Sequence, residues 1–348
     1  MRRYHLIVWI LLLCVCFSAC TPANTPSDIQ TNNQLKIHII DVGQGDSSFI
    51  ELPDGTTMLI DAGEREYGEK VVNYIRKLGH QQIDYLVGTH PHSDHIGGLR
   101  YVVEKMQIGK VYMPKKASTT ATFKNLLTAI KNKNLSIETA KAGKSITLNE
   151  DFRVDIISPV GDDYGDEMNL YSAVIKITYG KMRFLFMADA ETENEEQLAG
   201  VAAEFVRVGH HGSNTSSGAE FVRRVGAKIA VVSVGKDNSY GLPKDKILKR
   251  WQDMGATLYR TDEMGDLIFV SDGQSISVGE TVYTDISENN EQDNGKWVLN
   301  TSSKRVHLPD CPSISKIKAE NKETSEQSLE LLLKEGYTLC GSCKPEEE

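Results

Sequence analysis

Short apolar runs alternate with amphipathic patterns along most of this chain. Three runs near the N-terminal end, LKIHII (35–40), SSFIEL (47–52) and TMLIDAG (57–63), predict the strands of a meander. Apolar residues at helical spacing predict helices over 66–78, 123–130 and 191–198. Further strand-like runs cover 83–90, 154–158, 173–180, 182–190, 205–212 and 229–235. This interleaving favours a mixed α/β sandwich over an all-β fold.

Polar segments divide the chain into parts. Residues 20–34 lack periodicity and predict a flexible tether, and residues 285–296 are acidic, lack core residues and predict a linker. We therefore expect one folded domain over 35–284 and a second, small one over 297–345. A domain of roughly 50 residues is near the size at which a metal or a disulfide is needed for folding.

The N-terminal segment reads MRRYHLIVWILLLCVCFSAC. Its apolar run of 14 residues, Leu6–Ala19, is short for a membrane-spanning helix and fits a secretory signal. Small residues then precede Cys20, which resembles a bacterial lipoprotein signal. The resemblance implies removal of residues 1–19, lipidation of Cys20 and an extracytoplasmic protein anchored to the cell membrane. An ordinary signal peptide cut elsewhere, or an uncleaved anchor, stays open.

Composition narrows the class of protein. Of the 348 residues, 40% are hydrophobic and 25% are charged, which excludes wholesale disorder. Six cysteines are too few for a disulfide-built scaffold of this size. The net charge of −9 argues against a protein that coats nucleic acid through its overall charge.

One segment reverses that charge locally. Residues 100–145 contain ten basic and two acidic residues, and we hypothesise that they form a basic surface for DNA phosphates. Lys115 and Lys116 are the candidate contacts. A solvated helix face would produce the same composition, so that interpretation stays open.

The strongest chemical pattern is THPHSDHIGG at 89–98. In an extended loop, His90 and His92 project to one side and can share a metal, while Asp94 and His95 face a second metal one step along. Imidazole and carboxylate ligands suit zinc or manganese at a hydrolytic centre.

This HxHxDH pattern after a strand resembles the metallo-β-lactamase superfamily, whose fold is an αββα sandwich. Five more motifs stand in the order typical of the external hydrolase domain of ComEC-type competence proteins. They are DVGQGDS (41–47), LIDAG (59–63), MADAE (187–191), VGHHGS (208–213) and SVGKDNSYGLP (233–243). The resemblance covers about residues 35–280.

The resemblance implies roles for the metal ligands. His90 and His92 would hold metal one, Asp94 and His95 would hold metal two, and Asp189 would bridge both. Asp94 would also take part in catalysis. One histidine of the pair at 210–211 would complete the second site, and the other would lie within reach of the substrate. His211 is slightly preferred as the ligand over His210, because His-x-Ser recurs in related enzymes.

Other residues would support the ligands or contact the substrate. Asp46 and Asp61 would orient histidines, although each also fits a generic acidic turn. Ser213, Asn238 and Tyr240 would contact phosphate or base, although ordinary loop hydrogen bonding also explains them.

The sequence departs from the family pattern in three places. Many members supply a third histidine to metal one, but none occurs between His95 and Asp189. Asn169, followed by Ser172, stands there instead, which predicts a weakly held metal one, with manganese or a single zinc. Ala188 replaces a usual glycine, and Leu242 replaces a common histidine, which puts one substrate contact in doubt.

Two divalent ions can activate a bound water and neutralise the charge of an in-line displacement, so a phosphodiester is the natural substrate. No cysteine occurs between Cys20 and Cys311, which excludes a cysteine-liganded lactamase site. We expect a surface-anchored nuclease or other phosphodiesterase acting on extracellular DNA, with no nucleotide cofactor. An esterase of cell-wall phosphodiesters (choline or teichoic acid phosphate) and a non-catalytic DNA-binding surface module stay open.

The C-terminal segment carries a separate pattern, His307-x3-Cys311 followed by Cys340-x2-Cys343. Three thiolates and an imidazole suit a closed structural zinc site. The segment resembles the metal-binding domain of the Ada DNA-repair protein, with His307 in place of its methyl-accepting cysteine, so methyl transfer should be absent. A disulfide is the alternative, but it would leave one cysteine over and His307 unexplained.

Overall fold

The computed structural model describes residues 33–148, 151–279, 297–307, 311–325, 327, 332 and 335–340. Residue contacts divide the chain into two units, Met1–Thr281 and Val282–Glu348, and each is described by itself. The predicted signal peptide, Cys20, most of the predicted tether and the predicted linker lie outside the described residues. Among the helices of the described part, none is long and apolar enough to cross a membrane.

The first unit is built on two sheets. The larger has the strand order β15-β14-β1-β2-β3-β4-β5-β6. Its strands are β1 (Leu35–Ile39), β2 (Ser48–Glu51), β3 (Thr57–Ile60), β4 (Gln82–Val87), β5 (Gln107–Met113), β6 (Ile137–Thr139), β14 (Leu267–Ser271) and β15 (Ile276–Val278). Strands β1, β2 and β3 pair antiparallel, and β3 to β6 pair parallel.

The second sheet has the order β13-β12-β11-β10-β9-β8-β7. Its strands are β7 (Lys144–Leu148), β8 (Phe152–Ser158), β9 (Val174–Tyr179), β10 (Met182–Phe186), β11 (Phe205–Arg207), β12 (Ile229–Val232) and β13 (Thr257–Arg260). Strands β10 to β13 pair parallel.

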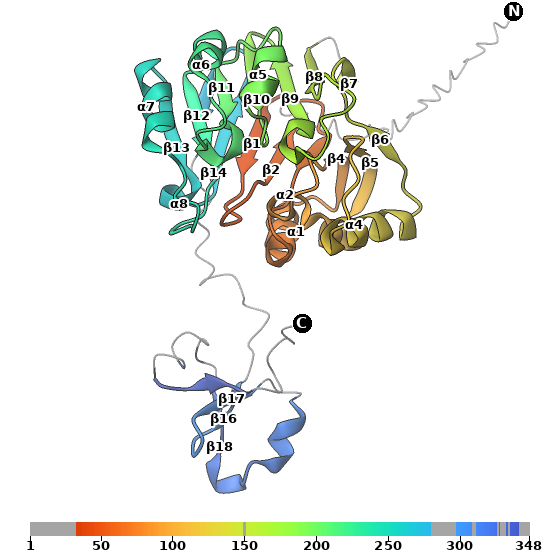
Figure 1. Ribbon diagram of the computed structural model, residues 1–348. Coiled ribbons are helices and arrows are strands. Elements are labelled where there is room, and N and C mark those ends of the chain that lie inside the picture. Colours follow the sequence, from red (N-terminus) through yellow and green to blue (C-terminus); the bar gives the residue numbers. More distant parts are fainter. Residues whose placement is uncertain are drawn as a thin grey trace, which may run out of the picture. The chain divides into compact units, whose positions relative to one another are not determined.

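Helices cover the outer face of each sheet (Figure 1). The core between the sheets includes Ile37, Ile50, Phe184 and Phe205, while alternate residues such as Phe49 pack under the helices. The first sheet is covered by α1 (Gly68–Lys77), α3 (Leu99–Lys105) and α4 (Ala121–Asn132), and the second by α5 (Thr192–Gln197), α6 (Ala219–Val225) and α7 (Asp245–Asp253). The four layers confirm the predicted α/β sandwich.

In each sheet, the parallel strands end at the same edge. Open α/β sheets bind their ligands at the edge formed by the carboxyl ends of their strands. Asp61 directly follows β3, and His90 lies three residues beyond β4. In the other sheet, Asp189 lies three residues beyond β10, and His210 lies three residues beyond β11. The topology therefore gathers ligand types that are more than a hundred residues apart in the sequence.

The second unit has a four-stranded sheet in the order β18-β16-β17-β19. The strands are β16 (Trp297–Asn300), β17 (Arg305–His307), β18 (Lys322–Ser325) and β19 (Thr338–Leu339), with short 3₁₀ turns η4 (Pro312–Lys316) and η5 (Ala319–Asn321). Its described core is small and consists of Leu299, Val306, Leu332 and Tyr337. A core of this size contributes little stability by itself.

Candidate metal centre

The HxHxDH motif turns from a strand into a short helix. Its last three positions and Ile96 form α2 (Ser93–Ile96), and His92 precedes the helix with an extended backbone. The loop Asp41–Asp46 lies against this turn, since the Asp46 N–H donates to the Asp94 carbonyl at 3.0 Å. A Cβ on Gly45 would lie 2.3 Å from that same carbonyl oxygen, so only glycine permits the approach. This contact explains why a glycine-rich loop accompanies the histidine motif.

Three side chains form what we call the metal-one group, His90, His92 and Asp189. The His90 Nε2 lies 3.0 Å from the His92 Nδ1 and 3.8 Å from the Asp189 Oδ2. These are the two histidines that the sequence assigns to metal one, together with the aspartate assigned to both metals.

Four side chains form the metal-two group, Asp94, His95, Asp189 and His211. The His95 Nε2 lies 3.2 Å and the His211 Nε2 lies 3.5 Å from the Asp189 Oδ1. The His211 Nε2 is also 3.3 Å from the Asp94 Oδ2. The structure thus brings together the side chains assigned to metal two, with His211 as the histidine of the pair that lies in this group.

Unpartnered polar atoms support a cation at this group. The His95 Nε2, the Asp189 Oδ1 and the His211 Nε2 are buried and have no hydrogen-bond partner. Leaving such groups unpaired costs about 1–3 kcal/mol each. Because all three are metal-ligating atoms that converge on one point, the residues present fit a divalent ion.

Protonation favours the same conclusion. Burial, followed by repulsion from His95, holds the pKa of His90 well below its ordinary value, so its imidazole is neutral. Burial raises the pKa of Asp189, but His95 and His211 more than offset this, so the pKa lies well below its ordinary value. Burial lowers the pKa of His95, but Asp189 and Asp94 reverse this, and the net pKa lies well above its ordinary value. A bound cation would replace the proton on His95.

The supporting carboxylates have different partners. Asp61 is fully buried, and its Oδ2 lies 2.8 Å from the His95 Nδ1 and accepts the Thr89 hydroxyl at 2.6 Å. It can therefore orient His95, as the sequence predicts. Asp46 instead forms a close ion pair with Arg207, and its Oδ2 lies 3.8 Å from the His95 Nδ1.

Arg207 is a site residue that sequence reasoning missed. It is 1% exposed, and its Nη1 donates to the Ala188 carbonyl at 2.7 Å while its Nη2 lies 3.0 Å from the His211 Nδ1. Burial lowers the pKa of Arg207 to about 9, which still leaves the guanidinium charged at neutral pH. The available signal was a lone arginine inside the apolar strand FVRVG, where a charge needs a buried partner.

Comparison with known proteins now decides the family. A model of the Metallo-beta-lactamase superfamily matches residues 40–236, which is more than half of the chain. This chain belongs to the metallo-β-lactamase superfamily. The first unit is accordingly a metallo-β-lactamase-fold hydrolase, and the fold implies divalent metal ions.

Its relatives include competence proteins. ComE operon protein 3 of Bacillus subtilis (strain 168) is 30% identical over 257 residues, which are 68% of this chain and 33% of the relative. Competence protein ComA of Neisseria gonorrhoeae is 27% identical over 278 residues, 77% of this chain and 36% of the relative. Recombination protein 2 of Haemophilus influenzae is 24% identical over 225 residues, 62% and 26% respectively. The chain thus spans about a third of the length of these curated relatives or less.

Asn169 and Ser172 are the residues that the family resemblance places where many members have a third histidine for metal one. The Asn169 Nδ2 donates to the Glu191 Oε1 at 2.9 Å, and its Oδ1 is buried without a partner. Ser172 is fully buried, and its hydroxyl likewise has no partner. Neither belongs to the metal-one group.

The three residues predicted to contact substrate differ in exposure and in their hydrogen bonds. Tyr240 is 67% exposed. Asn238 donates to the carbonyls of Gly235 and Leu242 and accepts the N–H groups of Tyr240 and Leu242, so its amide shapes the loop. The Ser213 hydroxyl lies 3.2 Å from the Thr215 hydroxyl.

The two lysines at the end of β5 also differ. Lys115 is exposed, while Lys116 donates to the Gly165 carbonyl, pairs with Asp166 and lies 5.0 Å from the centre of the Tyr171 ring. Lys116 therefore stabilises the loop that contains Gly165 and Asp166.

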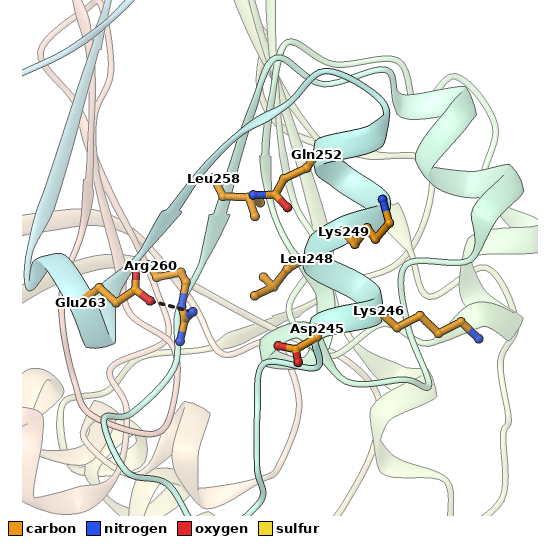
Figure 2. A pocket seen from close by; sticks show the side chains of 8 residues that line it. All are labelled: Asp245, Lys246, Leu248, Lys249, Gln252, Leu258, Arg260 and Glu263. Atoms are coloured by element: carbon orange, nitrogen blue, oxygen red, sulfur yellow. Dashed lines mark ion pairs between the residues drawn. The ribbon is translucent and has the colours of Figure 1, made fainter.

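A cavity of about 660 Å³ lies away from these groups, between α7 and β13. Figure 2 shows its lining of mixed charge: Asp245, Lys246, Leu248, Lys249, Gln252, Leu258, Arg260 and Glu263. Arg260 is paired with Asp262 and Glu263. None of the metal-group residues lines this cavity.

In the second unit, His307, Cys311 and Cys340 bring their ligand atoms within 4.8 Å of one another. All three side chains are buried, and the His307 Nδ1 lies 3.5 Å from the Cys311 Sγ. This group could bind a metal. The fourth predicted ligand, Cys343, lies outside the described residues.

Proposed function

We propose that this chain is a metal-dependent phosphodiesterase that cleaves DNA outside the cytoplasm. The observation that carries the proposal is the placement of Asp189, whose Oδ2 faces the metal-one histidine His90 and whose Oδ1 faces His95 and His211 of metal two. Two divalent ions at such a carboxylate would activate a water and neutralise the charge that develops on a phosphodiester. Zinc and manganese both suit this ligand set.

This chain's own residues would orient the attacking water. Asp94 is the more open carboxylate of the two metal groups, at 26% side-chain exposure against 3% for Asp189. Asp94 would therefore be the carboxylate that a water from solvent meets first, and it would take part in catalysis by orienting that water. Asp61 fixes His95 from behind, and the Ser233 carbonyl, 2.9 Å from the His211 Nδ1, does the same for His211.

Charge near the motif supports a polyanionic substrate. Lys115 follows β5, which pairs parallel with β4, so both Lys115 and the histidine motif lie at carboxyl ends of neighbouring strands. Helix α4 packs against α2 and α3 and carries the exposed Lys124 and Lys131. Four other basic residues of this segment are paired with acids: Arg100, Lys116, Lys141 and Lys144. The predicted basic surface is therefore reduced to exposed lysines such as Lys115, Lys124 and Lys131.

Two further parts of the proposal concern the ends of the chain. Cys20 would carry a lipid that anchors the protein at the membrane, with the hydrolase outside the cytoplasm. Relatives named as competence proteins are consistent with a substrate of external DNA. His307, Cys311 and Cys340 would hold a structural zinc with Cys343.

The test uses the purified full chain with manganese or zinc, single- and double-stranded DNA, and a phosphorylcholine ester. A His92→Ala, Asp94→Ala variant is the inactive reference, and Glu193→Gln, at an exposed position of α5, is the matched control. DNA cleavage by the parent and the control alone supports the proposal. Ester turnover with intact DNA would indicate the cell-wall esterase, and DNA binding without turnover would indicate the non-catalytic module.

Salt dependence tests the basic surface separately. Lys115→Glu and Lys124→Glu should weaken DNA binding and lower the salt slope by about one per lysine. Lys249→Glu on α7, at the opposite helical layer, is the control and should change neither. Equal slopes in all variants would count against the surface.

A further inference from the structure

Among the described residues, the metal-one group contains two imidazoles and no third. It consists of His90, His92 and Asp189, and Asn169, which the resemblance places at the usual histidine position, donates its amide to Glu191. A hydrolytic site with two imidazoles and one shared carboxylate would hold its ion weakly compared with the four-residue group of metal two.

His210 lies beside this gap. Its backbone N–H donates to the Ala188 carbonyl at 2.8 Å, which ties the histidine pair to the turn that carries Asp189. Its Nε2 lies 3.7 Å from the Asp189 Oδ2, the same oxygen that faces the His90 Nε2. The neighbouring His211 faces the other oxygen, Oδ1. Consecutive histidines therefore approach opposite sides of one carboxylate.

The backbone of the pair is strained into this arrangement. His210 has φ 48° and His211 has φ 51°, both in the left-handed region that costs a side-chain-bearing residue about 1–2 kcal/mol. Strain of this kind persists only where the surroundings hold it, and it concentrates at functional sites.

The far nitrogen of His210 is held like that of a metal ligand. The Nδ1 lies 2.9 Å from the Thr215 hydroxyl and 3.4 Å from the Glu191 Oε1. Glu191 is itself fixed by the Asn169 amide and by its position as the N-cap of α5, where its N–H donates to the Asn194 Oδ1 at 3.0 Å. A carboxylate at Nδ1 leaves the Nε2 lone pair for a metal, as in carboxylate–histidine–metal arrangements.

We propose that His210 is the third imidazole ligand of metal one, positioned by Glu191 and Asn169. The consecutive histidines His210 and His211 would then bind metal one and metal two, respectively. The proposal rests on the metal dependence proposed above and is independent of DNA as the substrate. His210 stands outside the compact metal-one group, so ion binding would draw its ring toward His90 and His92.

The experiment measures manganese binding, because thiolates of the second unit prefer zinc and so leave manganese to report on the hydrolase centre. Metal-free full chain, His210→Gly, Glu191→Gln and the control Glu193→Gln are titrated by calorimetry and by electron paramagnetic resonance. Glycine suits the positive φ at 210, so the variant should keep its fold, which circular dichroism of the metal-free protein checks.

The parent and Glu193→Gln should bind two manganese ions per chain and give the signal of an exchange-coupled pair. His210→Gly should keep one tight ion and bind the second at least about 10–100-fold more weakly, and Glu191→Gln should weaken the same ion by about 10–100-fold. Imidazole in the buffer should restore the coupled signal of His210→Gly. Two ions bound by His210→Gly with parental affinity would overturn the proposal, and a simultaneous loss of activity would then place His210 on the substrate. A parent that binds a single ion would overturn it too.

Discussion

The buried ion pair between Arg207 and Asp46 lies beside the metal-two histidine His211, whose Nδ1 is 3.0 Å from the Arg207 Nη2. Arg207 is 1% and Asp46 is 5% exposed, so both charges are out of water. Replacing Arg207 alone with methionine would leave the Asp46 carboxylate without its counter-charge. Breaking a buried pair from one side costs about 3–5 kcal/mol, because an uncompensated charge remains inside. A loss of this size is a large part of the stability of an ordinary domain.

Two further variants make the result interpretable. The double variant Asp46→Leu, Arg207→Met removes both charges. Its free energy of unfolding should therefore be higher than that of the parent or at most about 1 kcal/mol lower. Arg223→Met removes an arginine from an exposed pair with Glu220, whose side chains are 66% and 65% exposed, and should cost under about 1 kcal/mol.

The assay is urea unfolding of the metal-free protein, followed by tryptophan fluorescence. Trp251, which is fully buried on α7, reports on the first unit, and a Trp297→Phe background removes the signal of the second unit. The expected order of stability puts Arg207→Met lowest and the double variant near the parent. A loss below about 1 kcal/mol for Arg207→Met, or a double variant as unstable as the single one, would refute the reasoning.

Three other outcomes are expected. Ala188 has φ 49°, so Ala188→Gly should stabilise the metal-free protein by about 1 kcal/mol and raise its Tm by about 2–4 °C in calorimetry; a lower Tm would contradict the strain argument. Burial raises the pKa of Glu195 to about 7, above its ordinary value of 4.5, so its contribution to stability is present below pH 4.5 and is lost as the pH rises through 7. Glu195→Gln should therefore flatten the dependence of Tm on pH between 5 and 8, and an unchanged profile would argue against this carboxyl. Cys340→Ser should lower the zinc content of the chain by one equivalent in a colorimetric release assay, whereas a parent lighter by the two hydrogens of a disulfide in mass spectrometry would contradict the zinc site.

Local patterns carried the fold prediction because the two sheets and their helices have clear periodicity. The runs at 35–40, 47–52 and 57–63 correspond to β1, β2 and β3, and the helix expected over 66–78 is α1, preceded by a short 3₁₀ turn at Arg65–Tyr67. Strand β5 was missed, since its first four residues are exposed or half-exposed and show no apolar alternation. Helix α7 was missed because it buries only Ile247 and Trp251.

The site was predictable where its ligands are close in sequence. His90, His92, Asp94 and His95 fall within six residues, so their spacing alone marks a metal site. Asp189 and His211 were reached only through the family resemblance, because their proximity depends on how the second sheet packs against the first. The loop role of Asn238 and the pairing of Lys116 with Asp166 depend on three-dimensional contacts that no spacing encodes.

The positive φ angles of the site follow from the same long-range packing. Asp61, Ala188, His210 and His211 are non-glycine residues with φ between 48° and 57°, and all four lie where strand ends of the two sheets turn toward Asp189. Backbone hydrogen bonds hold these strand ends together, such as Asp61 N–H to the Val87 carbonyl at 2.9 Å and His210 N–H to the Ala188 carbonyl at 2.8 Å. The fold therefore supplies the free energy that holds the ligands in place before any ion arrives, which reduces the rearrangement needed on binding. If this is so, relieving the strain at Ala188, whose side chain ligates nothing, should raise stability without changing metal affinity, whereas glycine at His210 should relieve strain and weaken metal one together.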